Sequence, residues 1–251
     1  MYSFYGHLST EVYDLDKPVG RAYPDLEFYM ERLQGCKGKI LEPAVGTGRI
    51  LIPLVQEGWE VHGMDRSTEM LSLCRAHCEK RGLTPLLYEE DMVSFSLPHQ
   101  YEAIIVPTGS FLLIQDRSDS LQALTCFYEH LAPGGRLILD LFLQTQLQPG
   151  YVSTRTWTNA EGELITLEEK LVEVDYIQQY TVSHLKYEKW RDKKLVQTEL
   201  EYFPLRWYGV EEFREILQRI GFTEIVISAD YKYGVYPTKA DQVITFEARR
   251  I

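Results

Sequence analysis

The chain has 251 residues, of which 45% are hydrophobic and 25% are charged, as in an ordinary soluble globular protein. No apolar run approaches the roughly 18 to 20 residues that a membrane span needs, and the first residues lack the basic region and apolar core of a signal peptide. We therefore expect a cytoplasmic protein without a membrane partner. The formal net charge of −11 argues against a nucleic-acid partner, and the four cysteines lack the companions that a zinc site needs, so no metal is expected.

Short apolar runs alternate with helical patterns between residues 38 and 143. The runs cover residues 39–43, 60–64, 85–90, 102–107 and 136–143. Apolar residues recur at helical spacing between them, and each helical pattern ends at a glycine or at Pro-Gly-Gly. Strands that are apolar on both faces and alternate with helices predict a doubly wound α/β domain with a mostly parallel, seven-stranded sheet.

The pattern changes between residues 151 and 208. The segments there are long, rich in Thr, Val and Tyr, and joined by turn-like residues. In the last of them apolar and polar side chains alternate, as in a half-buried antiparallel strand. We expect an antiparallel β insertion that caps the domain, which itself comprises residues 36–150 and 209–251.

The stretch "ILEPAVGTGR" (residues 40–49) runs from a strand into a glycine turn and a helix, where bare backbone N–H groups can approach a ligand. A dinucleotide fingerprint, G-x-G-x-x-G, would place its glycines at Ala44, Gly46 and Arg49. Two of the three are missing, and Glu42 would face a pyrophosphate. These residues disfavour a nucleotide-dependent oxidoreductase and favour a ligand that is cationic near the acid.

The stretch resembles motif I of the class I S-adenosylmethionine-dependent methyltransferases, an acid followed by x-G-x-G-x-G, with Ala44 at the first glycine. The methionine end of that cofactor carries an ammonium and a sulfonium, which suit a carboxylate. The resemblance implies that this turn binds S-adenosylmethionine. Its cofactor-binding residues would be Glu42, Ala44, Gly46, Thr47 and Gly48.

The following strands match the same family. Asp65 ends the second strand, where the family's acid binds both ribose hydroxyls, and Arg66 follows it. Met70 matches the apolar residue that covers the adenine. An acid at a strand end is usually partly solvated, so we expect Asp65 to contribute little to folding.

The third strand ends in "EEDM", in which Asp91 and Met92 match the family's acid and apolar residue at the adenine, with Glu89 and Glu90 as competitors. After the fourth strand the family has its reaction cleft, which begins here with Pro107 and Thr108.

Residues 1–35 resemble the family's helical lid, and Tyr13 is a candidate to close over the methionine end of the cofactor. Arg21 is assigned to the cofactor as well. The catalytic group is unknown, and the candidates for substrate orientation or proton removal are His7, Glu11, Tyr13, Arg21, His184 and Arg206.

The segment after the fourth strand lacks the Asn-Pro-Pro-Tyr and Asp-Pro-Pro-Tyr motifs of DNA and protein amino-methyltransferases, and it lacks the cysteine of cytosine-C5 enzymes. Small-molecule methyltransferases of the amino-sugar and glycine types carry a β-cap at the position of this insertion. The resemblance therefore implies methyl transfer to a small N or O acceptor. A non-catalytic S-adenosylmethionine-binding regulator is the alternative, and the oligomeric state stays open, a homodimer included.

Overall fold

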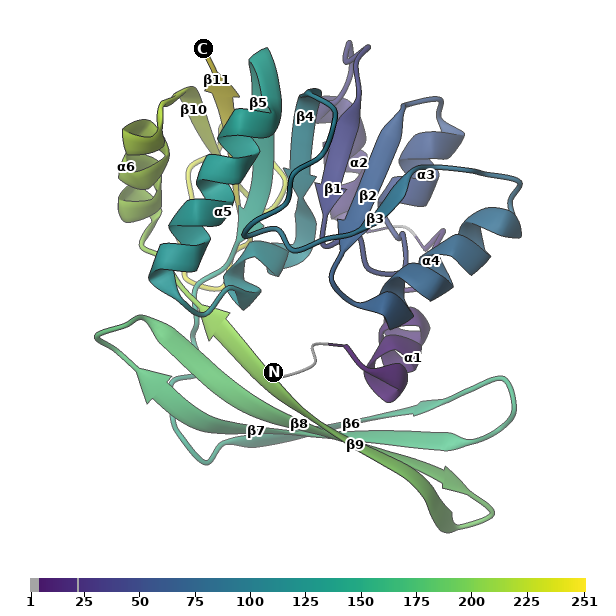
Figure 1. Ribbon diagram of the computed structural model, residues 1–251. Helices are drawn as coiled ribbons and strands as arrows, with labels where there is room; N and C mark the ends of the chain where they lie inside the picture. The colour runs from purple at the N-terminus through teal and green to yellow at the C-terminus, as the bar shows by residue number, and fades with distance from the viewer. Residues whose placement is uncertain (1–4, 22) are drawn as a thin grey trace.

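The computed structural model describes residues 5–21 and 23–251, which form two β-sheets and the helices around them (Figure 1). The helices are α1 (His7–Asp16), α2 (Pro24–Arg32), α3 (Leu51–Gln56), α4 (Thr68–Glu79), the 3-10 helix η1 (Pro107–Leu113), α5 (Arg117–His130) and α6 (Val210–Ile220). The strands of the larger sheet are β1 (Ile40–Pro43), β2 (Val61–Asp65), β3 (Leu87–Glu89), β4 (Tyr101–Val106), β5 (Leu131–Leu141), β10 (Phe222–Ala229) and β11 (Ile244–Arg250). The smaller sheet contains β6 (Val152–Thr158), β7 (Leu164–Asp175), β8 (Tyr180–Arg191) and β9 (Lys194–Arg206).

The larger sheet has the order β10-β11-β5-β4-β1-β2-β3. β1, β2, β3, β4 and β5 pair in parallel, whereas β11 runs antiparallel to both of its neighbours. The predicted mostly parallel, seven-stranded α/β sheet is therefore confirmed. β5 begins at Leu131 rather than at residue 136, because Leu131 already pairs with Tyr101 of β4, and a register shift separates this pair from the next one, Ala103 with Arg136.

Both faces of this sheet are buried, which explains the continuous apolar runs in the sequence. Ala103 and Ile105 of β4 pack with α2, α3 and α4, whereas Ile104 and Val106 pack on the opposite face with α5 and α6. Successive side chains of a strand point to opposite faces, so each strand contributes to two separate cores.

The smaller sheet is an antiparallel meander in the order β6-β7-β8-β9. It lies across the carboxyl ends of the parallel strands of the larger sheet (Figure 1). Helix α1 sits between the two sheets. Leu8 and Val12 of α1 form a third apolar core with residues of β7 and β8. We call this smaller sheet the cap.

Two carboxylates of β9 hold the N-terminus of α1. The Leu8 N–H donates to Glu199 Oε2 at 3.0 Å, and the Gly6 N–H donates to Glu201 Oε1 at 2.9 Å. The Ser9 hydroxyl contacts both carboxyl groups. The first N–H groups of a helix lack partners within it and carry a partial positive charge, so the cap supplies the N-terminal caps that α1 itself lacks.

Candidate active site

A cavity of about 1060 Å³ lies between the carboxyl ends of the parallel strands and the cap. Each of the central strands contributes a residue at or just after its end. These residues are Ala44, Asp65, Glu90, Thr108 and Phe142. On the opposite side, β7, β9 and the turn between β7 and β8 close the cavity. The site is therefore formed by both sheets.

The glycine turn after β1 forms one wall of the cavity. Ala44 and Gly46 line it, and both have left-handed backbones, with φ of 55° and 56°. Gly48 has φ of 86°, and a Cβ there would lie 2.8 Å from Cys74 Sγ. The turn therefore needs glycine at 48 for close packing against α4, while Ala44 carries backbone strain that a glycine would avoid.

Asp65 ties this turn to the end of β2. Its Oδ2 accepts the Gly46 N–H and its Oδ1 accepts the Ser67 N–H, each at 2.9 Å. The residue lines the cavity with only 9% of its surface exposed, and burial raises the pKa of its carboxyl. The expectation that Asp65 is partly solvated was wrong. Because its carboxylate satisfies two backbone donors of the site, we now expect Asp65 to contribute to folding.

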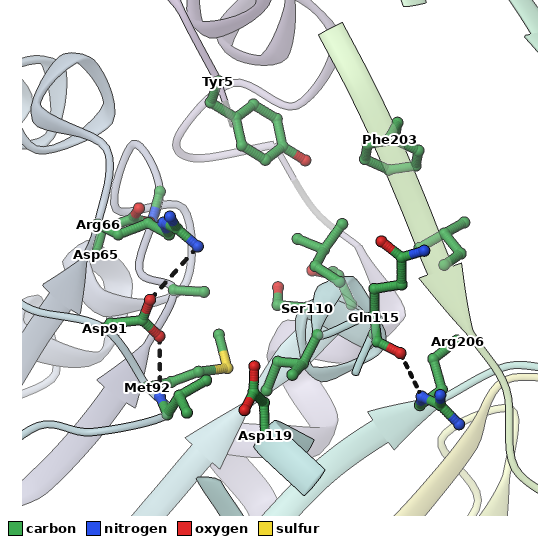
Figure 2. Close-up of a pocket in the computed structure, with 18 of the residues that line it drawn as sticks. Tyr5, Asp65, Arg66, Asp91, Met92, Ser110, Gln115, Asp119, Phe203 and Arg206 are labelled. Atoms are coloured by element: carbon green, nitrogen blue, oxygen red, sulfur yellow. Dashed lines mark hydrogen bonds and ion pairs between the residues drawn. The ribbon is translucent and has the colours of Figure 1, made fainter. Parts of the chain in front are cut away.

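Beyond Asp65, the predicted adenine-side residues gather at one end of the cavity (Figure 2). Arg66 Nη1 lies 3.4 Å from Asp91 Oδ2, and Asp91 Oδ1 accepts the Val93 N–H at 2.9 Å. Met70 and Met92 also line the cavity. Of the competing acids, Glu90 lines it as well, whereas Glu89 lies outside the lining.

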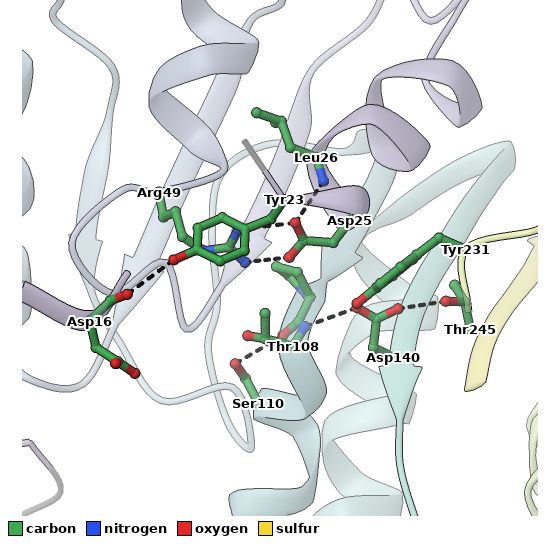
Figure 3. Close-up of polar contacts among 11 residues, drawn as sticks. Asp16, Tyr23, Asp25, Leu26, Arg49, Thr108, Ser110, Asp140, Tyr231 and Thr245 are labelled. Atoms are coloured by element: carbon green, nitrogen blue, oxygen red, sulfur yellow. Dashed lines mark hydrogen bonds and ion pairs between the residues drawn. The ribbon is translucent and has the colours of Figure 1, made fainter. Parts of the chain in front are cut away.

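Behind the glycine turn the sequence prediction missed a buried ion pair (Figure 3). Arg49 Nη1 donates to Asp25 Oδ1 at 3.0 Å and Nη2 contacts Oδ2, with both residues at most 5% exposed. Arg49, which stands at the third glycine position of the dinucleotide fingerprint, therefore anchors α2 to the turn. The two partners lie 24 positions apart, and neither belongs to a recognisable motif.

Glu42 lies beside this pair and does not line the cavity. It is 2% exposed, and burial raises the pKa of its carboxyl well above the usual range, with Arg49 opposing the rise. Glu42 Oε2 and Thr47 Oγ1 are buried without a hydrogen-bond partner among the described residues. Neither residue lines the cavity, so their predicted contact with the cofactor stays a prediction.

The N-terminal segment supplies a further wall. Tyr13 of α1 lines the cavity, and so does Lys17 just after the helix, whose Nζ lies 5.4 Å from the Tyr13 ring centroid. Burial lowers the pKa of Lys17, and the nearby Arg49 charge adds to this effect. The sequence reading did not single out Lys17. Arg21 is exposed and lies outside the cavity lining.

The turn after β4 is held from behind by a fully buried carboxylate (Figure 3). Asp140 accepts the Thr108 N–H at 2.9 Å, the Tyr231 hydroxyl at 3.2 Å and the Thr245 hydroxyl at 2.7 Å. Thr108 and Gly109 both have left-handed backbones, and a Cβ on Gly109 would lie 2.2 Å from the Phe142 ring. Thr108 lines the cavity, whereas Pro107 lies outside its lining.

The cap contributes the opposite end of the cavity. Its lining residues are Glu169, Gln178, Tyr180, Phe203, Leu205 and Arg206. Gln115 and Asp116, between η1 and α5, and Asp119, in the first turn of α5, line the same end. Arg206 Nε donates to the Gln115 carbonyl at 2.8 Å. His7, Glu11 and His184 lie outside the lining, with His184 exposed on β8. The structure thus brings only Tyr13 and Arg206 of the catalytic candidates to the cavity.

Comparisons with known proteins agree with this geometry. Residues 40–135 match the model of a methyltransferase domain. The chain is 28% identical over 216 residues to a glycine/sarcosine N-methyltransferase from Halorhodospira halochloris, covering 84% of this chain and 76% of that protein. It is 28% identical over 163 residues to a dTDP-3-amino-3,6-dideoxy-alpha-D-glucopyranose N,N-dimethyltransferase from Streptomyces fradiae, covering 62% of each.

A solved structure resembles this fold over nearly the whole chain. The crystal structure of an S-adenosylmethionine-dependent methyltransferase from Clostridium acetobutylicum superimposes with a TM-score of 0.76 at 20% identity, covering 96% of each chain. The fold is that of the Rossmann-like methyltransferases. With the domain match and these relatives, the protein is an S-adenosylmethionine-dependent methyltransferase whose methyltransferase domain spans residues 40–135. Within the described ranges, no helix has the length and apolar character to cross a membrane.

The residues present fit S-adenosylmethionine. The left-handed turn at Ala44 and Gly46 brings its backbone to the cavity for the polar methionine end, and the buried Asp65 carboxylate, which also lines the cavity, suits the ribose. Both lie at the glycine-turn end, leaving the cap end of the cavity for a second molecule.

Proposed function

We propose that this enzyme methylates the nitrogen of a small-molecule amine that binds between the larger sheet and the cap. The observation that carries the proposal is the cavity of about 1060 Å³ with two chemically different ends. One end is built from the glycine turn, Asp65 and Asp91, and the other from cap side chains and the segment before α5. A transferase for two small substrates needs such a paired arrangement.

At the first end, Asp65 would accept the ribose hydroxyls, while Met70, Asp91 and Met92 would surround the adenine. Ala44 and Gly46 would present the turn's backbone to the methionine moiety. Lys17, which lines the cavity, offers a cation for its carboxylate. Tyr13 would cover this end, since its ring lies against Gly46.

An amine is favoured over an alcohol by the groups at the acceptor end. An alcohol needs a base to remove its proton, and the titratable groups that line this end are the carboxylates of Asp116, Asp119 and Glu169, the Tyr180 phenol and the Arg206 guanidinium. No histidine of the described residues lines the cavity. An ammonium loses its proton far more readily than an alcohol does, and this loss exposes the lone pair on nitrogen. One relative compared above is named an N-methyltransferase and the other an N,N-dimethyltransferase.

The protein's part in the reaction is then alignment and exclusion of water. The bound cofactor supplies an electrophilic methyl group on a sulfonium. The acceptor nitrogen would lose a proton to water and form the new N–C bond with its lone pair, the electrons of the broken C–S bond would stay on sulfur, and the methylated ammonium could then release its own proton to water. Phe142, Leu113 and Ile114 line the cavity and would keep this centre dry.

An acceptor screen with methyl-labelled S-adenosylmethionine tests the proposal. Small amines, amino acids and amino sugars are compared with matched alcohols, and the labelled product is identified by mass spectrometry. We expect label on nitrogen of one of the amines together with release of S-adenosylhomocysteine. Label on oxygen alone, or cofactor binding with no transfer to any amine, would contradict the proposal.

A further inference from the structure

We infer, resting on the proposed function, that the cap end of the cavity is a subsite for a single carboxylate of the acceptor, bound by Arg206. The acceptor would then be a small amino-acid-like zwitterion, rather than a phosphorylated compound such as a nucleotide-linked sugar.

Arg206 is a buried cation at the end of β9, where the chain leaves the cap for the larger domain. It is 2% exposed, lines the cavity, and lies across it from Asp65 and Arg66 (Figure 2). Its position at the far end from the adenine-side residues places it beyond the cofactor, where the acceptor must bind.

Its hydrogen bonds are incomplete. Nε donates to the Gln115 carbonyl at 2.8 Å, but Nη1 is buried without a partner. Among the described residues, no carboxylate oxygen lies within 4.0 Å of the guanidinium, although the chain carries a large excess of acids. The Tyr208 ring centroid lies 5.8 Å from the guanidinium carbon and the Asp116 charge is nearby, but neither supplies a hydrogen-bond partner for Nη1. A buried charge without a contacting anion is costly, and a bound carboxylate would offset that cost. The guanidinium fork matches the two oxygens of a carboxylate.

The surrounding charges select a carboxylate over a phosphate. Asp116, Asp119 and Glu169 line the same cavity. Hydrogen bonds from Ser118 and Asp119 hold the pKa of Asp116 below its usual range, and the Arg206 charge acts in the same direction, so Asp116 stays ionised at neutral pH. A phosphate or diphosphate would meet these acids with two or more negative charges. A carboxylate that belongs to an amine brings no net charge, and its ammonium would be attracted by them.

Binding probes test the subsite directly. The ¹⁵N-labelled protein, saturated with S-adenosylhomocysteine, is titrated separately with glycine, methylammonium and inorganic phosphate, while NMR follows Arg206 Nε–H and the Gln115 and Asp116 amides. We expect saturable shifts with glycine, at least roughly tenfold weaker binding of methylammonium, and no saturable response to phosphate.

Variants assign the effect to the guanidinium. Arg206→Met should weaken glycine binding roughly 10- to 150-fold while the affinity for S-adenosylhomocysteine changes less than about twofold. Arg219→Met, which removes an exposed arginine from α6, is the matched control and should change neither. If Arg206→Met does not fold, Arg206→Lys replaces it in the test. Lysine keeps the charge but lacks the bidentate guanidinium geometry, so we expect a smaller loss of glycine affinity.

Three results would overturn the subsite: methylammonium that binds as well as glycine, phosphate that binds in its place, or no saturable shift with any of the three probes. The labelled-methyl assay separates this inference from the proposed function. Glycine binding without transfer to any amine would contradict the proposed function alone. Transfer to amines without a carboxylate, with no glycine binding, would contradict the subsite alone.

Discussion

The two ends of the cavity are built in different ways. The glycine-turn end consists of residues at the ends of adjacent parallel strands, and backbone groups make its main contacts, as in the Gly46 N–H bond to Asp65. The cap end consists of side chains from β7, β9 and the segment before α5, which meet only in the folded molecule. A cofactor shared by a family can be bound by the first arrangement, whereas the second can vary with the acceptor.

The largest expected effect comes from the ion pair beneath the glycine turn. Asp25→Ala leaves the Arg49 guanidinium buried without its anion, so we expect the free energy of unfolding to fall by about 3–5 kcal/mol. Urea unfolding measures the change. Glu27→Ala on the exposed side of the same helix is the control and should stay within about 0.5 kcal/mol of the parent. Equal losses in the two variants would mean that this pair does not anchor the turn.

Asp140, which holds the turn after β4, should make the free energy of unfolding depend on pH. Burial raises its pKa to about 6, against about 3.9 in an unfolded chain. Because the native state binds the proton more tightly, this stabilisation is full below about pH 4 and is lost as the pH rises through 6. The loss amounts to about 3 kcal/mol.

Asp140→Asn should therefore flatten the decline in unfolding free energy between about pH 4 and 7, as measured by urea unfolding at a series of pH values. The exposed Asp241→Asn variant corrects for changes in net charge and should keep the slope of the parent. An unchanged slope in Asp140→Asn would show that this carboxyl does not titrate in that range.

Asp65 tests whether the glycine-turn end holds the ribose. Asp65→Ala should weaken cofactor binding roughly 10- to 150-fold, since hydrogen bonds to a charged group are lost. It should also lower the free energy of unfolding by about 1–3 kcal/mol, because the Gly46 and Ser67 N–H groups lose their acceptor. Asp65→Asn should lie between, and Glu89→Ala outside the cavity should change neither. A calorimetric titration that shows full affinity in Asp65→Ala would place the ribose elsewhere.

The smallest effect concerns the strain at Ala44. A left-handed backbone costs a non-glycine residue about 1–2 kcal/mol, and glycine loses about 0.5–1 kcal/mol through its greater unfolded-state freedom. Ala44→Gly should therefore stabilise the protein by about 0.5–1 kcal/mol in thermal unfolding. Ala76→Gly, within the regular helix α4, should have the opposite sign. Destabilisation by both would show that the turn is not strained at Ala44.

The same contrast explains what the sequence could predict. The alternating fold and the placement of Ala44, Gly46, Asp65, Met70 and Asp91 follow from local patterns, because parallel strands bring their carboxyl ends to one edge. The fold and the cofactor are confirmed; the role of each residue stays a prediction. These residues sit at fixed offsets from strands that could be recognised one at a time.

Long-range partners could not be predicted in this way. Asp140 accepts a hydrogen bond from Tyr231, 91 positions away, and Glu199 holds the N-terminus of α1 across 191 positions. His184 was a candidate in the sequence, yet its side chain on β8 is exposed to solvent. The sequence does not show which face of the cap is turned toward the larger sheet, so it could not place this side chain. Arg206 could be named as a candidate, but its burial and missing anion are properties of the folded chain.

A crystal structure of the enzyme with S-adenosylhomocysteine and glycine tests the division into two ends most directly. The account predicts the ribose hydroxyls within hydrogen-bond distance of Asp65, the adenine beside Met70 and Asp91, and the glycine carboxylate on Arg206 with its nitrogen toward the sulfur. A nucleoside lying against β7 and β9, or glycine bound away from Arg206, would contradict it.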